Sequence, residues 1–218
     1  MPPVRLLLLF AAAAFLVVFV QLGMLRFAFE RLGLSADSAS LLLMVTLLGS
    51  MINLPLFSVA TDPQAQEKRL REIPPILLRR LKLVPGRTLI AANVGGCVVP
   101  LAFSLYLYDF SRPGLAHTLA AVATVAMVSH GISVSVPRVG IVMPVLIAPL
   151  TAALAALMLD PQQAPVLAYI GGTLGVLIGA DLLRLKDIGK LGEPMASIGG
   201  AGSFDGIFVT GLVAVLLA

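Results

Sequence analysis

The sequence predicts an all-α fold, a polytopic membrane helix bundle with about seven transmembrane helices. Hydrophobic residues occupy 59% of the 218 positions, charged residues occupy 12%, and the mean hydropathy is +1.02. Soluble domains instead carry roughly 45–50% apolar and roughly 25% charged residues. Apolar stretches of about 20 residues, the length that crosses a bilayer, recur along the whole chain. We therefore expect one transmembrane domain over residues 1–218.

Seven stretches are candidates for the membrane-spanning helices. The first follows Arg5 and is longer than the apolar core of a secretory signal peptide, which has about 7 to 15 residues. We interpret it as an uncleaved helix. The last is rich in glycine in its first half, so it is either a full span or a re-entrant loop followed by a short helix. The seven expected spans are Leu6–Leu25, Ser38–Ala60, Thr88–Tyr108, Gly114–Ser133, Val139–Leu159, Pro165–Leu183 and Ala196–Ala218.

The distribution of basic residues predicts the orientation of the bundle. With the N-terminus inside, the cytoplasmic segments contain 12 of the 15 Lys and Arg residues, as the positive-inside rule requires. An odd number of spans then places the C-terminus outside. The longest cytoplasmic segment, residues 61–87, is a basic loop within the domain, and its interleaved apolar and basic residues suit a solvated or interfacial position.

Several kinds of chemistry lack their usual motifs. Cys97 has no second cysteine for a disulfide or a cysteine-based metal site. His117 and His130 are separated by roughly 20 Å along a helix, too far to share a metal. The glycines at 199–202 lack the Lys-Ser/Thr of a phosphate-binding loop. We therefore expect no metal and no cofactor. The basic residues cluster in loops between apolar stretches, as in membrane proteins, so we also expect no nucleic-acid partner.

Proline and glycine interrupt several of the expected spans. Each break frees backbone groups that lipid cannot satisfy, so the breaks must face protein or a watery cavity. Asn53 and Asn93 each lie beside such a break, where an amide either joins neighbouring helices or points into a shared cavity. Close helix packing best explains the pair Gly171 and Gly172.

Two aspartates lie inside apolar segments near the end of the sequence. An ionised group in hydrocarbon costs roughly 2.5 to 3.5 kcal/mol on insertion scales, so Asp181 and Asp205 call for an explanation. If residues 197–203 form a loop, both carboxylates reach the inner leaflet and can meet there. A close pair of carboxylates shares one proton, and can act as general acid and base or carry a proton or cation.

Each aspartate also has a purely structural explanation. Asp181 is spaced to form a salt bridge with the basic residues that follow it on the helix, Arg184 and Lys186. Asp205 can cap the last helix.

These observations predict a site formed by the last two spans and the two asparagines. Its predicted catalytic residues are Asp181 and Asp205. The residues predicted to line its cavity or contact the substrate are Asn53, Asn93, Gly179, Gly199, Gly200, Gly202, Ser203, Phe204 and Gly206.

Three segments resemble one family of bacterial and archaeal membrane proteins, described as domain of unknown function 1614. The segments are Asn93–Pro100, Ile178–Leu185 and Ser197–Phe208, and the resemblance extends over essentially the whole chain. It implies a multipass protein of the prokaryotic cytoplasmic (inner) membrane and no particular reaction.

A second resemblance is to the intramembrane aspartyl proteases of the presenilin and prepilin-peptidase type. The segment Gly179–Leu185 is similar to a shortened form of the signature Gly-x-Gly-Asp-x-Lys-Leu, with Ala180 where the second glycine stands. In those enzymes the other catalytic aspartate comes earlier in the chain, whereas Asp205 comes later. The resemblance implies an aspartate pair that cleaves transmembrane peptides.

The sequence leaves three functions open. The first is a protease-like intramembrane hydrolase with Asp181 and Asp205 as its acid/base pair. The second is a proton- or cation-coupled transporter of a small solute, in which broken helices expose carbonyls to the ion; so short a chain would need a second copy of itself for that task. The third is a non-catalytic scaffold or assembly subunit. The expected partners are the lipid bilayer and either a transmembrane peptide or a proton or cation.

Overall fold

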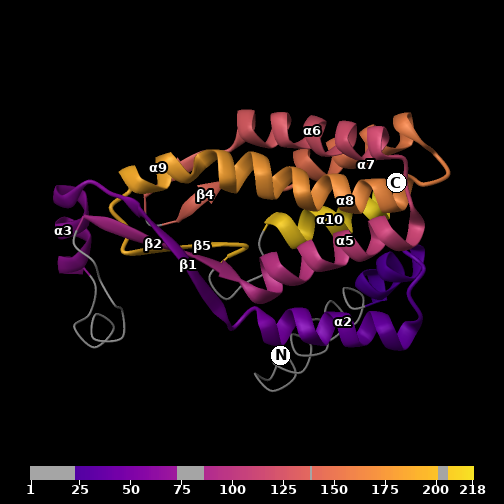
Figure 1. Cartoon of the computed structure of the whole chain (residues 1–218), viewed down its shortest axis with the longest axis horizontal. Helices are drawn as coiled ribbons and strands as arrows, with labels where there is room; N and C mark the ends of the chain where they lie inside the picture. The colour runs from indigo at the N-terminus through magenta and orange to yellow at the C-terminus, as the bar shows by residue number, and fades with distance from the viewer. Residues whose placement is uncertain (1–22, 73–85, 138, 201–205) are drawn as a thin grey trace, which may run out of the picture.

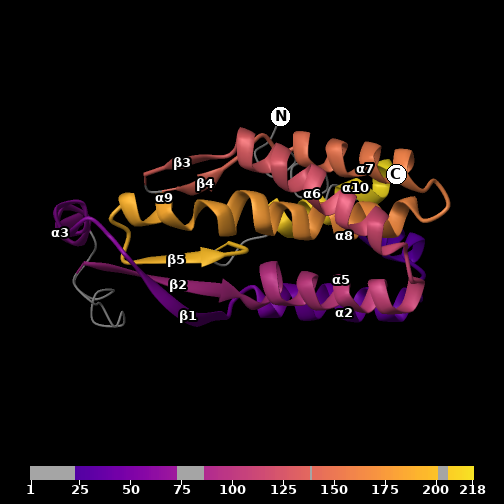
Figure 2. The ribbon, with the colours of Figure 1, turned by 45° about the horizontal axis from the view of Figure 1, so that its top comes forward.

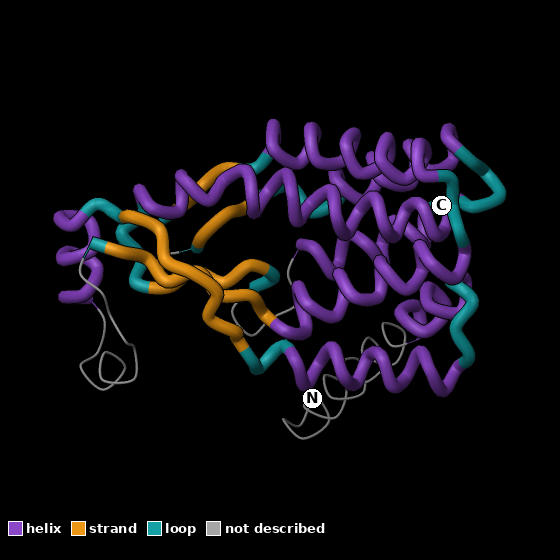
Figure 3. Tube along the Cα trace, viewed as in Figure 1, coloured by secondary structure: helices purple, strands orange, loops and turns teal. Residues whose placement is uncertain are grey.

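The helices form a bundle with strands gathered beyond one of its ends (Figure 3). A computed structural model describes residues 23–72, 86–137, 139–200 and 206–218. The bundle helices lie side by side along the long axis, and along the chain each runs opposite to the one before (Figures 1 and 2). They are α2 (Ala36–Gly49), α5 (Val99–Ser111), α6 (Leu115–Ile132), α7 (Ile147–Leu159), α8 (Ala164–Val176) and α10 (Gly206–Leu217). We call the end with the strands the sheet end and the opposite end the far end.

The expectation of an all-α bundle is wrong at the sheet end. The span expected at 38–60 is helical only to Gly49 and continues as a strand, and three other expected spans begin as strands. A short apolar run fits a buried strand as well as a helix segment, so its pattern does not separate the two. The strands are β1 (Asn53–Ala60), β2 (Arg87–Asn93), β3 (Val134–Val136), β4 (Gly140–Val142) and β5 (Met195–Ile198).

The strands form a three-stranded sheet and a separate hairpin. The sheet has the order β1-β2-β5; β1 and β2 are antiparallel, with Asn53 opposite Asn93, and β5 is parallel to β2. Strands β3 and β4 pair with each other. The proline that the sequence pattern placed inside a helix, Pro55, lies on the edge strand β1 beside a register shift, where a missing backbone donor is tolerated. Two shorter helices, α3 (Pro63–Glu72) and α9 (Leu185–Lys190), also lie at the sheet end (Figure 2).

Fewer helices than expected are long enough to cross a bilayer alone. Within the described residues, three have the length and composition of a span: Val94–Ser111, Leu115–Ile132 and Ala164–Lys190. The helical segment Gly23–Arg31 and α2, bent by 116°, together make a fourth candidate. Helices α7 and α10 are apolar but shorter. The first expected span, residues 6–25, lies almost entirely outside the described residues.

Helix α8 is the centre of the bundle. Nearly all of its side chains are buried, and it packs against α5, α6, α7 and α10. Its glycines permit this close approach: a Cβ on Gly171 would lie 3.1 Å from the Cβ of Ala121, and one on Gly175 would lie 2.5 Å from the Cβ of Val125. In lipid, the hydrophobic effect does not drive helices together, so their association depends on such close packing.

We expect Gly175→Ala to destabilise the protein by about 1–3 kcal/mol, because the new methyl group would overlap Val125 and the backbone of α6. The matched control is Gly131→Ala on α6, where an added Cβ meets nothing within 4 Å. That control should be neutral or stabilise by roughly 0.5–1 kcal/mol, since alanine favours the helix. Thermal unfolding in detergent micelles measures both, and equal shifts in Tm would contradict the packing described here.

Candidate functional site

Asp181 lies where the central helix changes its geometry. Beyond Val176, α8 continues through a π-helical turn, Leu177–Asp181, and a 3-10 turn, Leu182–Arg184, into α9. A π-helical turn inside an α-helix re-aims the side chains that follow and often marks a functional site. Asp181 is partly buried at the sheet end of the bundle.

Two cavities meet at Asp181. The sheet cavity, of about 260 Å³, lies beside β5 and α9. The bundle cavity, of about 280 Å³, lies between β4, the segment that follows it, α8 and α10. Asp181 and Ile141 line both cavities. The carboxylate therefore stands at the boundary between two spaces, which the sequence did not predict.

The sheet cavity contains a second carboxylate that sequence reasoning missed. Glu193 lies in the turn between α9 and β5 and lines this cavity together with Asp181, Ser197 and Gly200. The hydroxyl of Thr88 donates to the Glu193 carbonyl oxygen at 2.6 Å and ties this turn to β2. The sequence pattern does not single out Glu193, because it predicts no strand at residues 195–198 and therefore gives no sign that Glu193 lies just before one.

The structure describes some of the predicted site residues near the chain end and not others. Gly200 lines the sheet cavity and Gly206, the first residue of α10, lines the bundle cavity. The remaining predicted residues of this stretch lie outside the described residues: Gly202, Ser203, Phe204 and Asp205.

Asn53 and Asn93 form a hydrogen-bonded joint between the sheet and the bundle. The fully buried Asn93 donates through Nδ2 to the Ser50 carbonyl at 2.7 Å and to Asn53 Oδ1 at 3.2 Å, and its Oδ1 accepts from the Gly96 backbone N–H at 2.8 Å. Ser197 of β5 donates to Asn53 Oδ1 at 2.6 Å. The two asparagines line neither cavity at Asp181, so their amides hold the sheet end together.

Gly179 and Gly199 are positions of close backbone approach. A Cβ on Gly179 would overlap the carbonyl of Ala126 on α6, and the Gly179 carbonyl faces the ring of His130 at 3.2 Å from Nδ1. Gly199 has φ +80°, and a Cβ there would lie 2.6 Å from the backbone nitrogen of Cys97. Both glycines bring their helices or loops together without lining the two cavities.

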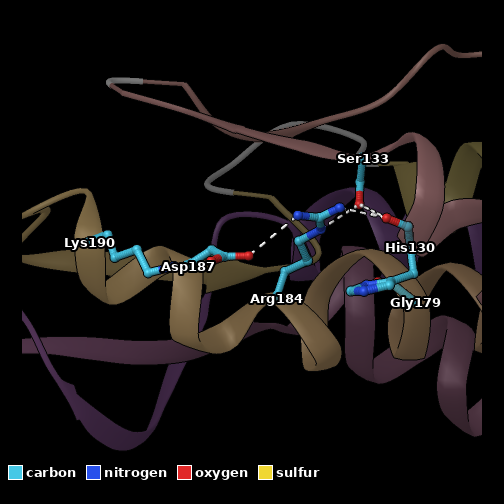
Figure 4. A network of polar contacts seen from close by, with 6 residues as sticks. All are labelled: His130, Ser133, Gly179, Arg184, Asp187 and Lys190. Atoms are coloured by element: carbon cyan, nitrogen blue, oxygen red, sulfur yellow. Dashed lines mark hydrogen bonds and ion pairs between the residues drawn. The ribbon is translucent and has the colours of Figure 1, made fainter.

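A cationic side chain ties the segment after Asp181 to the end of α6 (Figure 4). Arg184 donates to the Ser133 hydroxyl at 3.0 Å and to the His130 carbonyl at 2.6 Å, and pairs with Asp187 at 3.3 Å. Lys190 pairs with the same carboxylate at 2.7 Å. The guanidinium thus caps the C-terminal end of α6, where its charge and donors suit the helix dipole, and anchors the backbone three residues beyond Asp181.

Comparison with known proteins gives the family but no activity. Residues 47–217 match the family described as protein of unknown function, DUF1614. The chain belongs to the DUF1614 family. This confirms the resemblance to the DUF1614 family; the resemblance to intramembrane aspartyl proteases finds no support in these comparisons. With its apolar helices, the DUF1614 chain is an integral membrane protein of mostly helical fold. No curated protein and no solved structure matches it.

The DUF1614 chain shows no metal cluster in the part that the structure describes. No group of three His, Cys, Asp or Glu side chains is placed there to hold an ion.

We expect Arg184→Lys to lower stability by about 1–2 kcal/mol, because an ammonium group cannot reproduce the fork that reaches Ser133, His130 and Asp187 together. Arg71→Lys is the matched control, since the Arg71 side chain is 78% exposed and pairs only at the surface, whereas that of Arg184 is 21% exposed. The control should change little. Thermal unfolding of both variants checks this, and an equally small effect at Arg184 would show that its contacts do not stabilise the fold.

Proposed function

We propose that this DUF1614 protein is a protease-like intramembrane hydrolase whose acid/base pair is Asp181 and Asp205. The position of Asp181 at the meeting point of two cavities supports this most directly. Gly206 lines one of them, and the peptide bond from Asp205 keeps the two Cα atoms about 3.8 Å apart. The proposal requires the Asp205 carboxylate to enter that cavity.

The proposed reaction is addition of water to a peptide carbonyl. One carboxylate removes a proton from water as the water oxygen bonds to the carbonyl carbon, and the protonated partner gives its proton to the carbonyl oxygen. The gem-diol intermediate then collapses: the carboxyl group that took the proton from water gives it to the leaving nitrogen, the C–N bond breaks, and the other carboxylate takes a proton from a gem-diol hydroxyl as the new carbonyl forms. Glu193 and Ser197, the polar side chains that line the sheet cavity beside Asp181, suit the supply of water from that side.

A transporter is the second candidate, because a carboxylate between two cavities can pass a proton or cation from one to the other. In this alternative Asp181 binds the ion and the π-helical turn beside it gives the backbone freedom to rearrange. The two candidates use the same carboxylate for different purposes, so substitutions of Asp181 must be judged by two measurements.

We expect Asp181→Asn and Asp205→Asn each to reduce intramembrane cleavage by roughly 100-fold or more, the usual contribution of an acid/base group. The measurement is mass spectrometry of new peptide termini in membranes that contain each variant. Asp37→Asn, an exposed aspartate in the first turn of α2, is the control and should retain wild-type cleavage. Unchanged cleavage patterns would refute the hydrolase, and proton or cation flux in liposomes that is lost in Asp181→Asn would favour the transporter.

We further propose a seven-pass orientation in a prokaryotic cytoplasmic membrane, with the sheet end and the N-terminus inside and the C-terminus outside. The described residues near the sheet end include Lys68, Arg71, Arg87, Arg184, Lys186 and Lys190. Those near the far end include Arg26, Arg31 and Arg112. This asymmetry is the one that cytoplasmic loops carry.

This orientation predicts opposite labelling of the two ends. In a Cys97→Ala background, a cysteine in place of Asp37 should react with a membrane-impermeant maleimide on intact spheroplasts, because Asp37 lies at the far end. A cysteine in place of Lys190 at the sheet end should react only after the membrane is permeabilised. The reverse pattern would show that the sheet faces outward.

A further inference from the structure

The bundle cavity has the composition of a pocket for an apolar group. Its walls include Met143, Val176 and Val209, and its polar side chains are Asp181 and Thr210. An engineered apolar cavity of about 150 Å³ binds benzene, and pockets for whole small molecules have about 300–1,000 Å³. At about 280 Å³ the bundle cavity therefore suits one large side chain better than an entire lipid or drug-sized ligand.

The rim of this cavity carries exposed apolar side chains. Val145 lines the cavity and is 68% exposed, and the next residues, Leu146 and Ile147 at the start of α7, are also exposed. Apolar side chains exposed on the side of a membrane bundle lie against lipid. In the seven-pass arrangement proposed above, this rim lies against lipid, so a group held in the bilayer reaches the cavity past it.

Two residues set the size of the cavity. Met143 extends toward α10 and contacts the glycine that begins it: a Cβ on Gly206 would lie 2.8 Å from the Met143 methyl group. Val209 lies about one helical turn further along the same helix and forms another wall. The absence of a side chain at Gly206 leaves room for the Met143 methyl group.

We infer that the bundle cavity binds an aliphatic side chain of a transmembrane peptide, next to the peptide bond on which Asp181 acts. This inference rests on the proposed hydrolase function and adds its substrate preference. The apolar side chain enters from the bilayer past Val145, while the peptide backbone lies at the boundary with the sheet cavity, where Glu193 and Ser197 supply polar surroundings. Met143 and Val209 then determine which side chains fit.

The test uses photoreactive peptides that carry a statine group, a hydroxyl-bearing mimic of the tetrahedral intermediate. Three probes differ only in the side chain beside that hydroxyl: alanine, leucine or phenylalanine. They are applied to the full chain in proteoliposomes, and covalent labelling is quantified. A pocket that recognises an apolar side chain discriminates by roughly tenfold or more, so the leucine probe should label that much more strongly than the alanine probe.

Two variants address the pocket itself. Val209→Phe should lower labelling by the leucine probe roughly tenfold and leave the alanine probe within about twofold, because it fills the cavity. Met143→Ala should enlarge the cavity and shift the preference toward the phenylalanine probe, which keeps the test decisive if Val209→Phe does not fold. Val45→Phe, on the exposed surface of α2, is the matched control and should change nothing.

The outcomes separate the two proposals. If labelling depends on Asp181 but is the same for all three side chains and in both pocket variants, the substrate preference is overturned and the hydrolase stands. If none of the probes labels the protein in a manner that Asp181→Asn abolishes, the hydrolase itself is refuted, and the substrate preference with it.

Discussion

The arrangement of the sheet end depends on the hydrogen bonds that the side-chain amide of Asn93 makes. A bilayer offers no water to backbone groups that a helix leaves unpaired, so every change from helix to strand must be satisfied by the protein. Two such changes lie together here, between α2 and β1 and between β2 and the π-helical turn that precedes α5. Asn93 serves both, because it accepts from the Gly96 N–H and donates to the Ser50 carbonyl. Its bond to Asn53, which also accepts from Ser197, fixes β5 in the same arrangement.

Strand β5, held in this arrangement, forms one wall of the sheet cavity. Strand β5 is parallel to β2, and its residues line the cavity opposite α9. The backbone of Glu193 is held by Thr88, which lies on β2 as well. The sheet cavity thus depends on the same hydrogen bonds of Asn53 and Asn93 that connect the strands to the bundle helices.

Helix α8 is closely packed along most of its length and borders cavities at the end where the π-helical turn begins. Up to Val176 its glycines allow close packing against α6 and α10. Beyond that point the π-helical turn begins, and Asp181 stands between the sheet cavity, which Glu193 and Ser197 also line, and the bundle cavity, whose walls include Met143 and Val209. The proposed hydrolase needs both water and a lipophilic substrate at one carboxylate, and Asp181 is a carboxylate that borders both cavities.

The sequence by itself determined that this is a helical membrane protein of the DUF1614 family, because apolar composition and family motifs are properties of the chain that need no contacts. It also singled out Asp181, since a carboxylate in an apolar stretch is costly wherever it lies. Only the tertiary structure decided that four apolar stretches contain strands, that Glu193 shares a cavity with Asp181, and that Asn53 and Asn93 join the sheet to the bundle. A short apolar run is compatible with either a helix or a strand, and a loop glutamate looks solvated until distant segments meet around it.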